Sequence, residues 1–594
     1  MTRKTAFIAL LAALPLALAA QQPQKAPTYP APAIGASSTS LHQQFAAYWE
    51  WRLAESPELA TQVGRTEYND RWRDWSKAAR DRARVTRNEF LQQMLYIGTG
   101  NLTMSERLSA HLLEHEVRTE LEGERYLHLV QRVSQMNGAH NQVFTVFNQM
   151  PARTVKDYDN MVARLRALPT YVDQTIALMR EQLDAGIAQP AVVVDRIVEQ
   201  LAAQSRPAAA ESPLLAAFQN LPADMPAVDR TRLTQAATAA YEQEFVPSWK
   251  RLEAFFADTY RARVRPQVGL SSIPEGKTAY AVLAHTYTTT RMTPEAIHQL
   301  GLAEVARIDR EMERIAREAG FSGSATEFEQ QLKARPDQRF ASQDEMLTNA
   351  RQTLARLLPE MPRLFHRLPR AAVGVRPIPA DREASTASSY SAGTADGQRQ
   401  AWFNMNTYRP AEQVKYVTDA LVVHETVPGH HLQVGLAREL EGVPEFRRVF
   451  GATAFSEGWA LYAESLGPET GAVYRDPASR FGQLASEKFR AVRRDVDTGL
   501  HALGWTRERA LEYFAVNIPG QSVAEVDRYI AWPGQALAYK IGELKIKELR
   551  DRAQRALGNR FDIRDFHDAV LGNGTLPLDL LEEQVDAYIA SARS

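Results

Sequence analysis

From about residue 41 onward, apolar residues recur every three or four positions with charged residues between them, as in amphipathic helices. The pattern is clear over residues 105–130 and 154–185. Thr293, followed by proline and glutamate, has the signature of a helix start and opens a long amphipathic run through Ile315. The chain is therefore predicted to be helical nearly throughout.

Alternating patterns typical of strands are scarce. Residues 279–283 and 401–405 are the two short candidates. The second, extended to Asn406, reads AWFNMN, and it fits either an edge strand that pairs with an extended peptide or a plain structural strand. We predict a mainly α protein with at most a small β-sheet.

The first residues indicate export. Arg3 and Lys4 precede an apolar stretch over 6–18 and a small-x-small site before Ala20, the features of a cleavable signal peptide over 1–20. The apolar stretch is shorter than the roughly 20 residues of a membrane-spanning helix. We therefore expect a periplasmic or extracellular protein without a stable membrane anchor.

Composition shifts divide the rest of the chain. Residues 21–40 are rich in Pro, Ala, Gln and Ser, which predicts a flexible lead-in. A further Pro/Gly-rich break lies near 370–400. We place an N-terminal helical region at 41–370 and a C-terminal helical region, which carries the chemistry described below, at 371–594.

Charge and cysteine content exclude some functions. The net charge is −1, which gives nucleic-acid binding no electrostatic support. The sequence has no cysteine, so disulfides, thiol nucleophiles and a lipid anchor on cysteine are excluded. Histidine, aspartate and glutamate are the remaining candidates for metal ligands. The oligomeric state stays open.

The segment around His424 carries the clearest candidate chemistry. His424 lies on the predicted buried stripe of a helix, Glu425 follows it, and the next histidine, His430, is six residues along. In the common H-E-x-x-H motif the spacing is four, which places both imidazoles on one helix face. Pro428 and Gly429 can form a two-residue bulge, with Gly429 in unusual backbone angles, that brings His430 to the same face. His431 is the rival ligand.

A second helix, over 452–466, is predicted to be apolar on all sides and hence buried, yet it contains Glu457 and Glu464. Buried carboxylates need a partner or a metal. Two histidines and a carboxylate with one open position form a catalytic zinc shell, so we predict one Zn²⁺ bound by His424, His430 and Glu457. Glu464 either orients a ligand histidine or is a charge on the helix surface.

These motifs resemble those of the DUF885 family. The matching segments are HETVPGHHLQ at 424–433 and FSEGWALYAE at 455–464, with weaker matches along nearly the whole mature chain. The family is thought to share the architecture of helical gluzincins such as carboxypeptidase Taq and angiotensin-converting enzyme. The resemblance implies a large helical body with a deep active-site cleft.

Further residues are candidates for the chemistry. Glu425 is the natural base for a metal-activated water. Resemblance to the Arg-Tyr pair of angiotensin-converting enzyme suggests Tyr529 as the oxyanion donor, with His501 as a substitute and Tyr539 as a further candidate. Arg493 shares a predicted helix face with Asp497 and His501 and is a candidate to bind a substrate carboxylate. The alternative is a solvated stripe of ion pairs.

The predicted function is that of a zinc-dependent peptidase acting on peptide substrates. By analogy with helical gluzincins, we favour an exopeptidase, of carboxypeptidase or dipeptidase type, that cleaves short peptides. The alternatives are a zinc amidase or esterase on a non-peptide substrate, and a secreted helical binding protein with a vestigial metal site.

Overall fold

The structure is a computed structural model. It describes residues 38–97, 102–126, 133–136, 138–379, 383, 387–397, 399–520 and 523–593. The predicted signal peptide at 1–20 and nearly all of the predicted lead-in at 21–40 lie outside these residues, and the first helix begins at Ser38.

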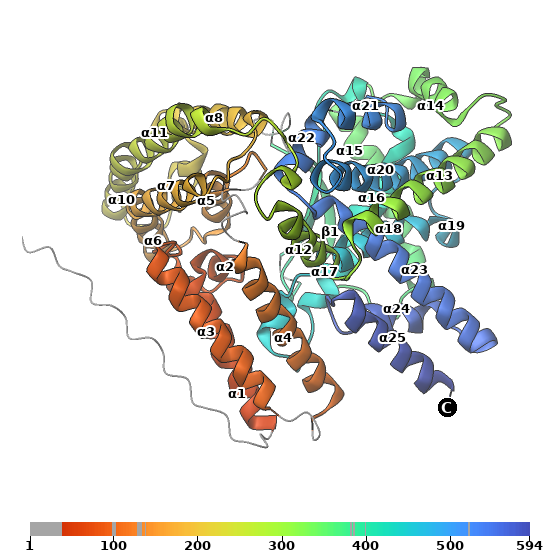
Figure 1. Cartoon of the computed structure of the whole chain (residues 1–594), viewed down its shortest axis with the longest axis horizontal. Helices are drawn as coiled ribbons and strands as arrows, with labels where there is room; N and C mark the ends of the chain where they lie inside the picture. Colours follow the sequence, from red (N-terminus) through yellow and green to blue (C-terminus); the bar gives the residue numbers. More distant parts are fainter. Residues whose placement is uncertain are drawn as a thin grey trace, which may run out of the picture.

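The described chain is mainly α-helical, as predicted. The N-terminal helices are α1 (Ser38–Glu55), α2 (Pro57–Gln62), α3 (Lys77–Tyr96) and α4 (Met104–Arg125). A second group consists of α5 (Ala139–Gln149), α6 (Val155–Arg166), α7 (Leu168–Asp184), α8 (Ala191–Ser205), α9 (Ala216–Gln219), α10 (Ala227–Ala240) and α11 (Val246–Ala254). Figure 1 shows these two groups on the left, below and above.

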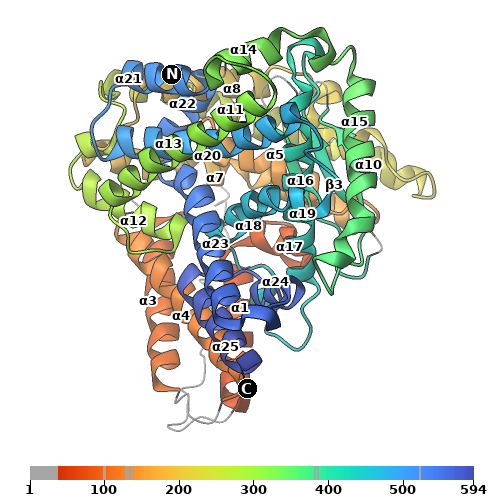
Figure 2. The same cartoon turned by 90° about the vertical axis from the view of Figure 1, so that its right-hand side faces the viewer.

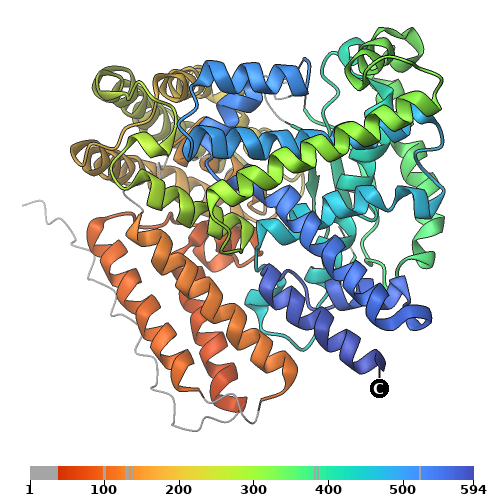
Figure 3. The same cartoon turned by 45° about the vertical axis from the view of Figure 1, so that its right-hand side comes forward.

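The remaining helices form the other side of the molecule (Figure 1). They are α12 (Gly276–Thr288), α13 (Pro294–Glu318), α14 (Ala325–Ala334), α15 (Gln343–Leu357), α16 (Thr418–Glu425), α17 (His430–Arg438), α18 (Thr453–Ser465), α19 (Gly467–Thr470), α20 (Pro477–His501), α21 (Arg507–Asn517), α22 (Val523–Ala531), α23 (Ala538–Leu557), α24 (Ile563–Leu571) and α25 (Leu578–Arg593). The long helices α13 and α20 pack along each other, as the green and blue ribbons of Figure 3 show.

Most predicted helices are present with shifted ends. Residues 154–185 form α6 and α7, which are separated at Ala167. Thr293 caps α13, because its hydroxyl accepts a hydrogen bond from the Ala296 amide at 3.2 Å. The predicted strand at 279–283 is wrong, since these residues lie within α12. A short apolar run cannot by itself distinguish a strand from a buried helix segment.

One small sheet is present in the described chain, with the order β1 (Val373–Pro377), β3 (Ala401–Met405), β2 (Ser389–Ser391). The predicted strand at 401–405 is confirmed with the same bounds. Strand β3 pairs in parallel with β1 and antiparallel with β2, so it is the central strand. Of the two alternatives for this segment, the edge strand is therefore excluded and the plain structural strand is confirmed, while β2 occupies an edge instead.

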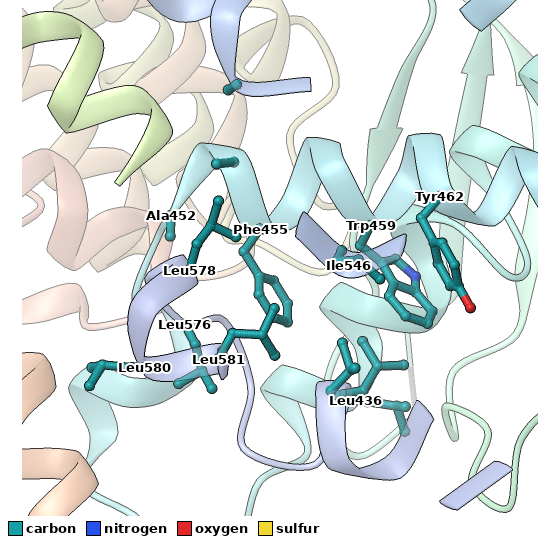
Figure 4. Packing of buried hydrophobic residues seen from close by; sticks show 14 of the residues in the cluster. Leu436, Ala452, Phe455, Trp459, Tyr462, Ile546, Leu576, Leu578, Leu580 and Leu581 are labelled. Carbon is teal, nitrogen blue, oxygen red and sulfur yellow. The ribbon is translucent and has the colours of Figure 1, made fainter. Parts of the chain in front are cut away.

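Two buried apolar clusters hold the molecule together. One extends along the sequence from Leu41 to Ile589 and the other from Trp72 to Ala536. Figure 4 shows part of the first, where Phe455 and Trp459 of α18 meet side chains such as Leu436 and Leu581. Both clusters draw on residues from each side of the predicted boundary at residue 370, so the two predicted regions share their cores.

Among the described residues, no helix has both the length and the apolar character that crossing a membrane requires.

Candidate metal centre

The segment predicted to hold the metal lies between α16 and α17, near the middle of the view in Figure 2. Helix α16 ends at Glu425 and α17 begins at His430. The Gly429 amide donates to the Val423 carbonyl at 3.0 Å, six residues back instead of the usual four. The backbone thus inserts two residues at this point, as the spacing of the histidines predicts.

Gly429 has the unusual backbone angles that the sequence predicts, with a φ of −78° and a ψ of −130°, but its φ is not left-handed. A Cβ built on Gly429 would lie 2.0 Å from the His424 carbonyl oxygen and 2.4 Å from that of Val423. Glycine is needed because the turn folds back tightly against the end of α16. The Trp459 indole of α18 donates to the Pro428 carbonyl at 2.8 Å and thereby supports the turn.

Three side chains converge beside this turn. His424, His430 and Glu457 each offer one ligand atom, and these atoms all lie within 4.8 Å of one another. Glu457 Oε2 is 3.5 Å from Nε2 of each imidazole. The three residues come from α16, α17 and α18, so the turn and the packing of α18 bring them together.

His424 is oriented from behind by Glu464. Its Nδ1 lies 2.9 Å from Glu464 Oε1, and Glu464 is fully buried, which excludes the alternative of a surface charge. If Nδ1 carries the proton of this hydrogen bond, Nε2 turns its lone pair toward Glu457. Arg490 of α20 lies 3.5 Å from the same Glu464 oxygen and offsets its charge.

The cluster favours a positive charge at its centre. Burial alone would lower the pKa of His424, but Glu457 and Glu464 outweigh it and raise that pKa to about 9. Burial alone would raise the pKa of Glu457, but the two imidazoles hold it well below its usual value. Glu457 Oε2 is buried and makes no hydrogen bond within the described chain. Two imidazoles and a carboxylate oxygen that face one another in this way fit a shared cation, which would take the place of the His424 proton.

The rival ligand His431 points elsewhere. Its Nδ1 lies 3.2 Å from the hydroxyl of Tyr390 on β2, and its ring also bonds the backbone of Ala371. Burial lowers its pKa to about 4. His431 is absent from the His-His-Glu cluster and instead ties α17 to the sheet.

The cluster opens into a cleft of about 1300 Å³. His424, His430, Glu457 and the predicted base Glu425 all line this cleft. Glu425 Oε2 is buried and has no hydrogen-bond partner in the part of the chain that the structure describes. The basic residues on the cleft wall are Lys333, Arg339, Lys488, Arg490, Arg493 and Arg528.

The structure brings two other predicted residues, Arg493 and Tyr539, to the cleft wall. Tyr529 is not on that wall; its buried hydroxyl donates to Glu525 Oε2 at 2.6 Å.

His501 is a structural residue. Its Nδ1 accepts the Leu270 amide at 3.1 Å and its Nε2 donates to the Tyr529 carbonyl at 3.0 Å, so neither nitrogen is free for catalysis. Asp497 accepts hydrogen bonds from the Tyr280 hydroxyl and the Gly534 amide, and orients neither Arg493 nor His501. The predicted common face of α20 exists, but its members are buried with separate partners.

Sequence reasoning missed two residues of the site. Arg490 contacts Glu464, and Tyr390 lines the cleft beside His431. Arg490 is three residues before Arg493 on the same helix, which is the signal that could have found it. Tyr390 lies in a serine-rich segment with no periodic pattern, so the sequence holds no comparable signal for it.

The fold and this site define a large, mainly α-helical protein with a His-His-Glu cluster in a deep cleft. The chain belongs to the DUF885 family, described as bacterial protein of unknown function, whose model matches residues 57–585. A comparison with curated proteins finds no match.

Two solved structures are similar. One, a crystal structure of a protein from Colwellia psychrerythraea, is 25% identical with a TM-score of 0.88, covering 93% of this chain and 99% of that one. The other, from Shewanella oneidensis, is 17% identical with a TM-score of 0.72, covering 92% of this chain and 99% of that one. Each carries only a provisional description as a lipoprotein, the second one of unknown function.

Proposed function

We propose that this protein is a zinc-dependent peptidase that hydrolyses short peptides. The observation that carries the proposal is the convergence of His424, His430 and Glu457 within reach of one ion, with Glu425 beside them in the cleft. Two imidazole nitrogens and one carboxylate oxygen are the donor set of catalytic zinc sites that keep one position for water. A histidine held by a buried carboxylate, as His424 is by Glu464, supports the same assignment.

A bound zinc ion would supply Lewis-acid activation of the scissile carbonyl and of the attacking water. Glu425, with its unpartnered oxygen in the cleft, would accept the proton from that water and pass it to the leaving amine. A binding protein with a vestigial site has no need of this second carboxylate.

Tyr390 is our candidate for the donor that stabilises the developing oxyanion. Tyr390 lines the cleft, and its hydroxyl lies 3.2 Å from Nδ1 of His431, the residue that follows the candidate ligand His430 in the sequence. It replaces Tyr529 in this role, because Tyr390 lines the cleft and Tyr529 does not.

Strand β2 supports a peptide as the substrate. Ser389 and Tyr390 of this edge strand line the cleft, and an extended peptide could add to that edge through main-chain hydrogen bonds. The provisional description of both structural relatives as lipoproteins is compatible with export, and we propose that this chain is exported too.

The test is hydrolysis of a peptide library by the purified protein, with zinc measured by mass spectrometry and with a chelator control. We expect one zinc per chain and an activity that the chelator abolishes and added zinc restores. Glu425→Gln should keep the zinc and lower turnover by about three orders of magnitude or more. The matched control is Glu329→Gln, because Glu329 also lines the cleft but is paired with Lys333.

Full activity in Glu425→Gln would remove Glu425 from the mechanism. Hydrolysis that persists after complete zinc removal would overturn the proposal as a whole. If esters or amides are cleaved but no peptide is, the substrate class is wrong while the metal chemistry stands.

A further inference from the structure

One arginine on the cleft wall lacks a hydrogen-bonding partner. Arg493 lies on α20 with a side chain only 4% exposed, and its Nε and Nη2 make no hydrogen bond within the described chain. A buried guanidinium without hydrogen bonds is costly, since desolvation is not compensated. Arg493 also lines the cleft, so its side chain borders the space that a ligand would occupy.

Aromatic rings hold this guanidinium in place. Its central carbon lies 4.4 Å from the ring centroid of Tyr539, 5.1 Å from that of Phe489 and 5.5 Å from that of Tyr529. Rings in this arrangement fix the position of a cation but do not satisfy its N–H donors. The donors are therefore preorganised for a group that the described chain does not supply.

The nearby carboxylate does not fill this role. Glu525 Oε2 is 3.7 Å from Arg493 Nη2, beyond hydrogen-bonding distance, and it accepts the Tyr529 hydroxyl at 2.6 Å. Glu525 also faces a second guanidinium, since its Oε1 lies 4.0 Å from Arg528. Two arginines therefore face the Glu525 carboxylate, and neither is within hydrogen-bonding distance of it.

The protein itself shows what such an arginine binds. Arg507 holds the Asp527 carboxylate through Nε at 2.7 Å and Nη2 at 3.1 Å, the same two donors that are unpartnered in Arg493. Planar, two-point binding of a carboxylate is the strongest use of a guanidinium. A ligand with a free carboxylate is therefore the best complement to Arg493.

Arg493 lies close along α20 to the residue that supports the His-His-Glu cluster. Arg490 contacts Glu464, which in turn holds His424, and Arg493 follows three residues later, about 4.5 Å further along the helix axis. Arg493 lines the same cleft as the cluster, so one extended ligand can contact both.

We propose that Arg493 binds the C-terminal carboxylate of the substrate, which makes the enzyme an exopeptidase that acts on free C-termini. This inference rests on the proposed peptidase function and specifies its substrate class. Arg493 acts as a substrate-binding residue that discriminates a free carboxylate from an amide. The cleft then selects short peptides by their ends instead of their side chains.

The test separates binding from hydrolysis by using the full chain with Glu425→Gln. N-acetylated alanine peptides of two to five residues and the same peptides with a C-terminal amide are titrated calorimetrically. We expect the acids to bind about 100-fold more tightly than the amides. Adding Arg493→Met should lower the affinity for the acids to the level of the amides and change the amide affinities by no more than a few-fold.

Two further variants control this experiment. Lys488→Met lies on the same helix and the same cleft wall, but its ammonium is paired with Asp309 at 2.7 Å, so it should keep the preference for acids. Arg493→Lys retains the charge and loses the planar fork, so an intermediate preference is expected. Arg493→Lys also takes the place of Arg493→Met in the test if circular dichroism shows that Arg493→Met is unfolded.

Equal binding of acids and amides by the parent protein overturns the inference, and so does an acid preference that survives in Arg493→Met. A preference that depends on Arg493, without peptide hydrolysis by the zinc-loaded wild type, supports carboxylate recognition and contradicts the peptidase. Hydrolysis of acids and amides at equal kcat/KM supports the peptidase and contradicts this inference.

Discussion

At the scale of single residues, the His-His-Glu cluster depends on buried side chains that are not members of it. Glu464 is fully buried, bonds His424 Nδ1 at 2.9 Å and is balanced by Arg490. Such a carboxylate fixes the imidazole ring and increases its basicity. Glu464→Gln should therefore weaken zinc binding by about 10- to 100-fold.

The measurement is competition with a chromophoric chelator. The control is Glu469→Gln, because Glu469 lies a short way along the chain and pairs with Arg550 away from the cluster. Unchanged zinc affinity in Glu464→Gln would show that the buried contact orients His424 without affecting the metal.

The two tyrosines give a second prediction. Tyr390→Phe should lower kcat by about 100-fold with zinc content unchanged, because it removes one donor to the oxyanion. Tyr529→Phe should lower stability and leave kcat within a few-fold, since its hydroxyl is bonded to Glu525 and Tyr529 itself does not line the cleft. Steady-state kinetics and zinc content are compared in both variants. The reverse ranking of the two effects on kcat would restore Tyr529 as the donor.

The sequence allowed site residues to be predicted where their positions follow from short spacings along the chain. His424, His430 and Glu457 could be grouped because two histidines flanking a Pro-Gly pair and an acidic residue in a buried helix are typical of a metal site. His501 and Tyr529 were misplaced for a physical reason: helix spacing gives the face of a residue but not what covers that face. Their partners, Leu270 and Glu525, come from packing that no local pattern encodes.

At the scale of secondary structure elements, the turn at 426–429 sets the position of His430 relative to His424. The predicted need for glycine is correct in position, but its cause is close approach to the carbonyl of His424 and not its φ. A Cβ of any kind would clash there. Gly429→Ala should therefore be nearly as damaging as Gly429→Val, although alanine carries no β-branch.

We expect Gly429→Ala to lower zinc affinity by about 10-fold or more and to destabilise the fold by about 1–3 kcal/mol, because the turn must shift to relieve the overlap. Zinc content after dialysis and urea unfolding measure the two effects. The matched control is Gly451→Ala, since a Cβ on Gly451 meets nothing within 4 Å. Full zinc affinity in Gly429→Ala would mean that the turn adjusts without moving His430.

The three strands show which features of the sheet the sequence pattern predicts and which it does not. The alternation in 401–405 gave β3 with correct bounds, because its residues are alternately buried and half-buried. Its central place could not be predicted, since that depends on β1 and β2, whose sequences carry little alternation. For the same reason, the sequence did not indicate that Ser389 and Tyr390 of β2 line the cleft.

At the scale of the whole molecule, the site is assembled from distant parts of the chain. Met312, Glu329 and Arg339 line the cleft together with residues after 387, so the predicted boundary at residue 370 runs through the site. The helical class could be predicted from periodicity alone, because it is a sum of local patterns. The cleft could not, because it is a property of how α13, α16, α18 and α20 pack.

Buried histidines couple the stability of this assembly to pH. His567 of α24 accepts the Tyr462 hydroxyl of α18 at 2.9 Å and donates to the Leu364 carbonyl at 2.8 Å. Burial lowers its pKa from 6.5 to about 3. The unfolded chain therefore binds a proton first, so the stability that this residue contributes is present above pH 6.5 and is lost as the pH falls toward 3.

Two buried aspartates change the stability of the folded state in the opposite direction over the same pH range. Burial raises the pKa of Asp495 and of Asp497 to about 7, so their contributions to stability increase as the pH falls from 7. The pH dependence of the wild type alone is a sum of opposing effects. A comparison with a variant that lacks only His567 removes the contributions that both proteins share.

We therefore compare the wild type with His567→Gln by urea unfolding at pH 7 and at pH 5. At pH 7 the variant should be less stable, because the contacts to Tyr462 and Leu364 are weakened. From pH 7 to pH 5 the wild type should lose about 2 kcal/mol more than the variant, since one histidine must remain neutral over about 1.5 pH units below its unfolded pKa. Parallel pH profiles would show that His567 takes up a proton in the folded state. The packing between α18 and α24 would then tolerate a charge on His567.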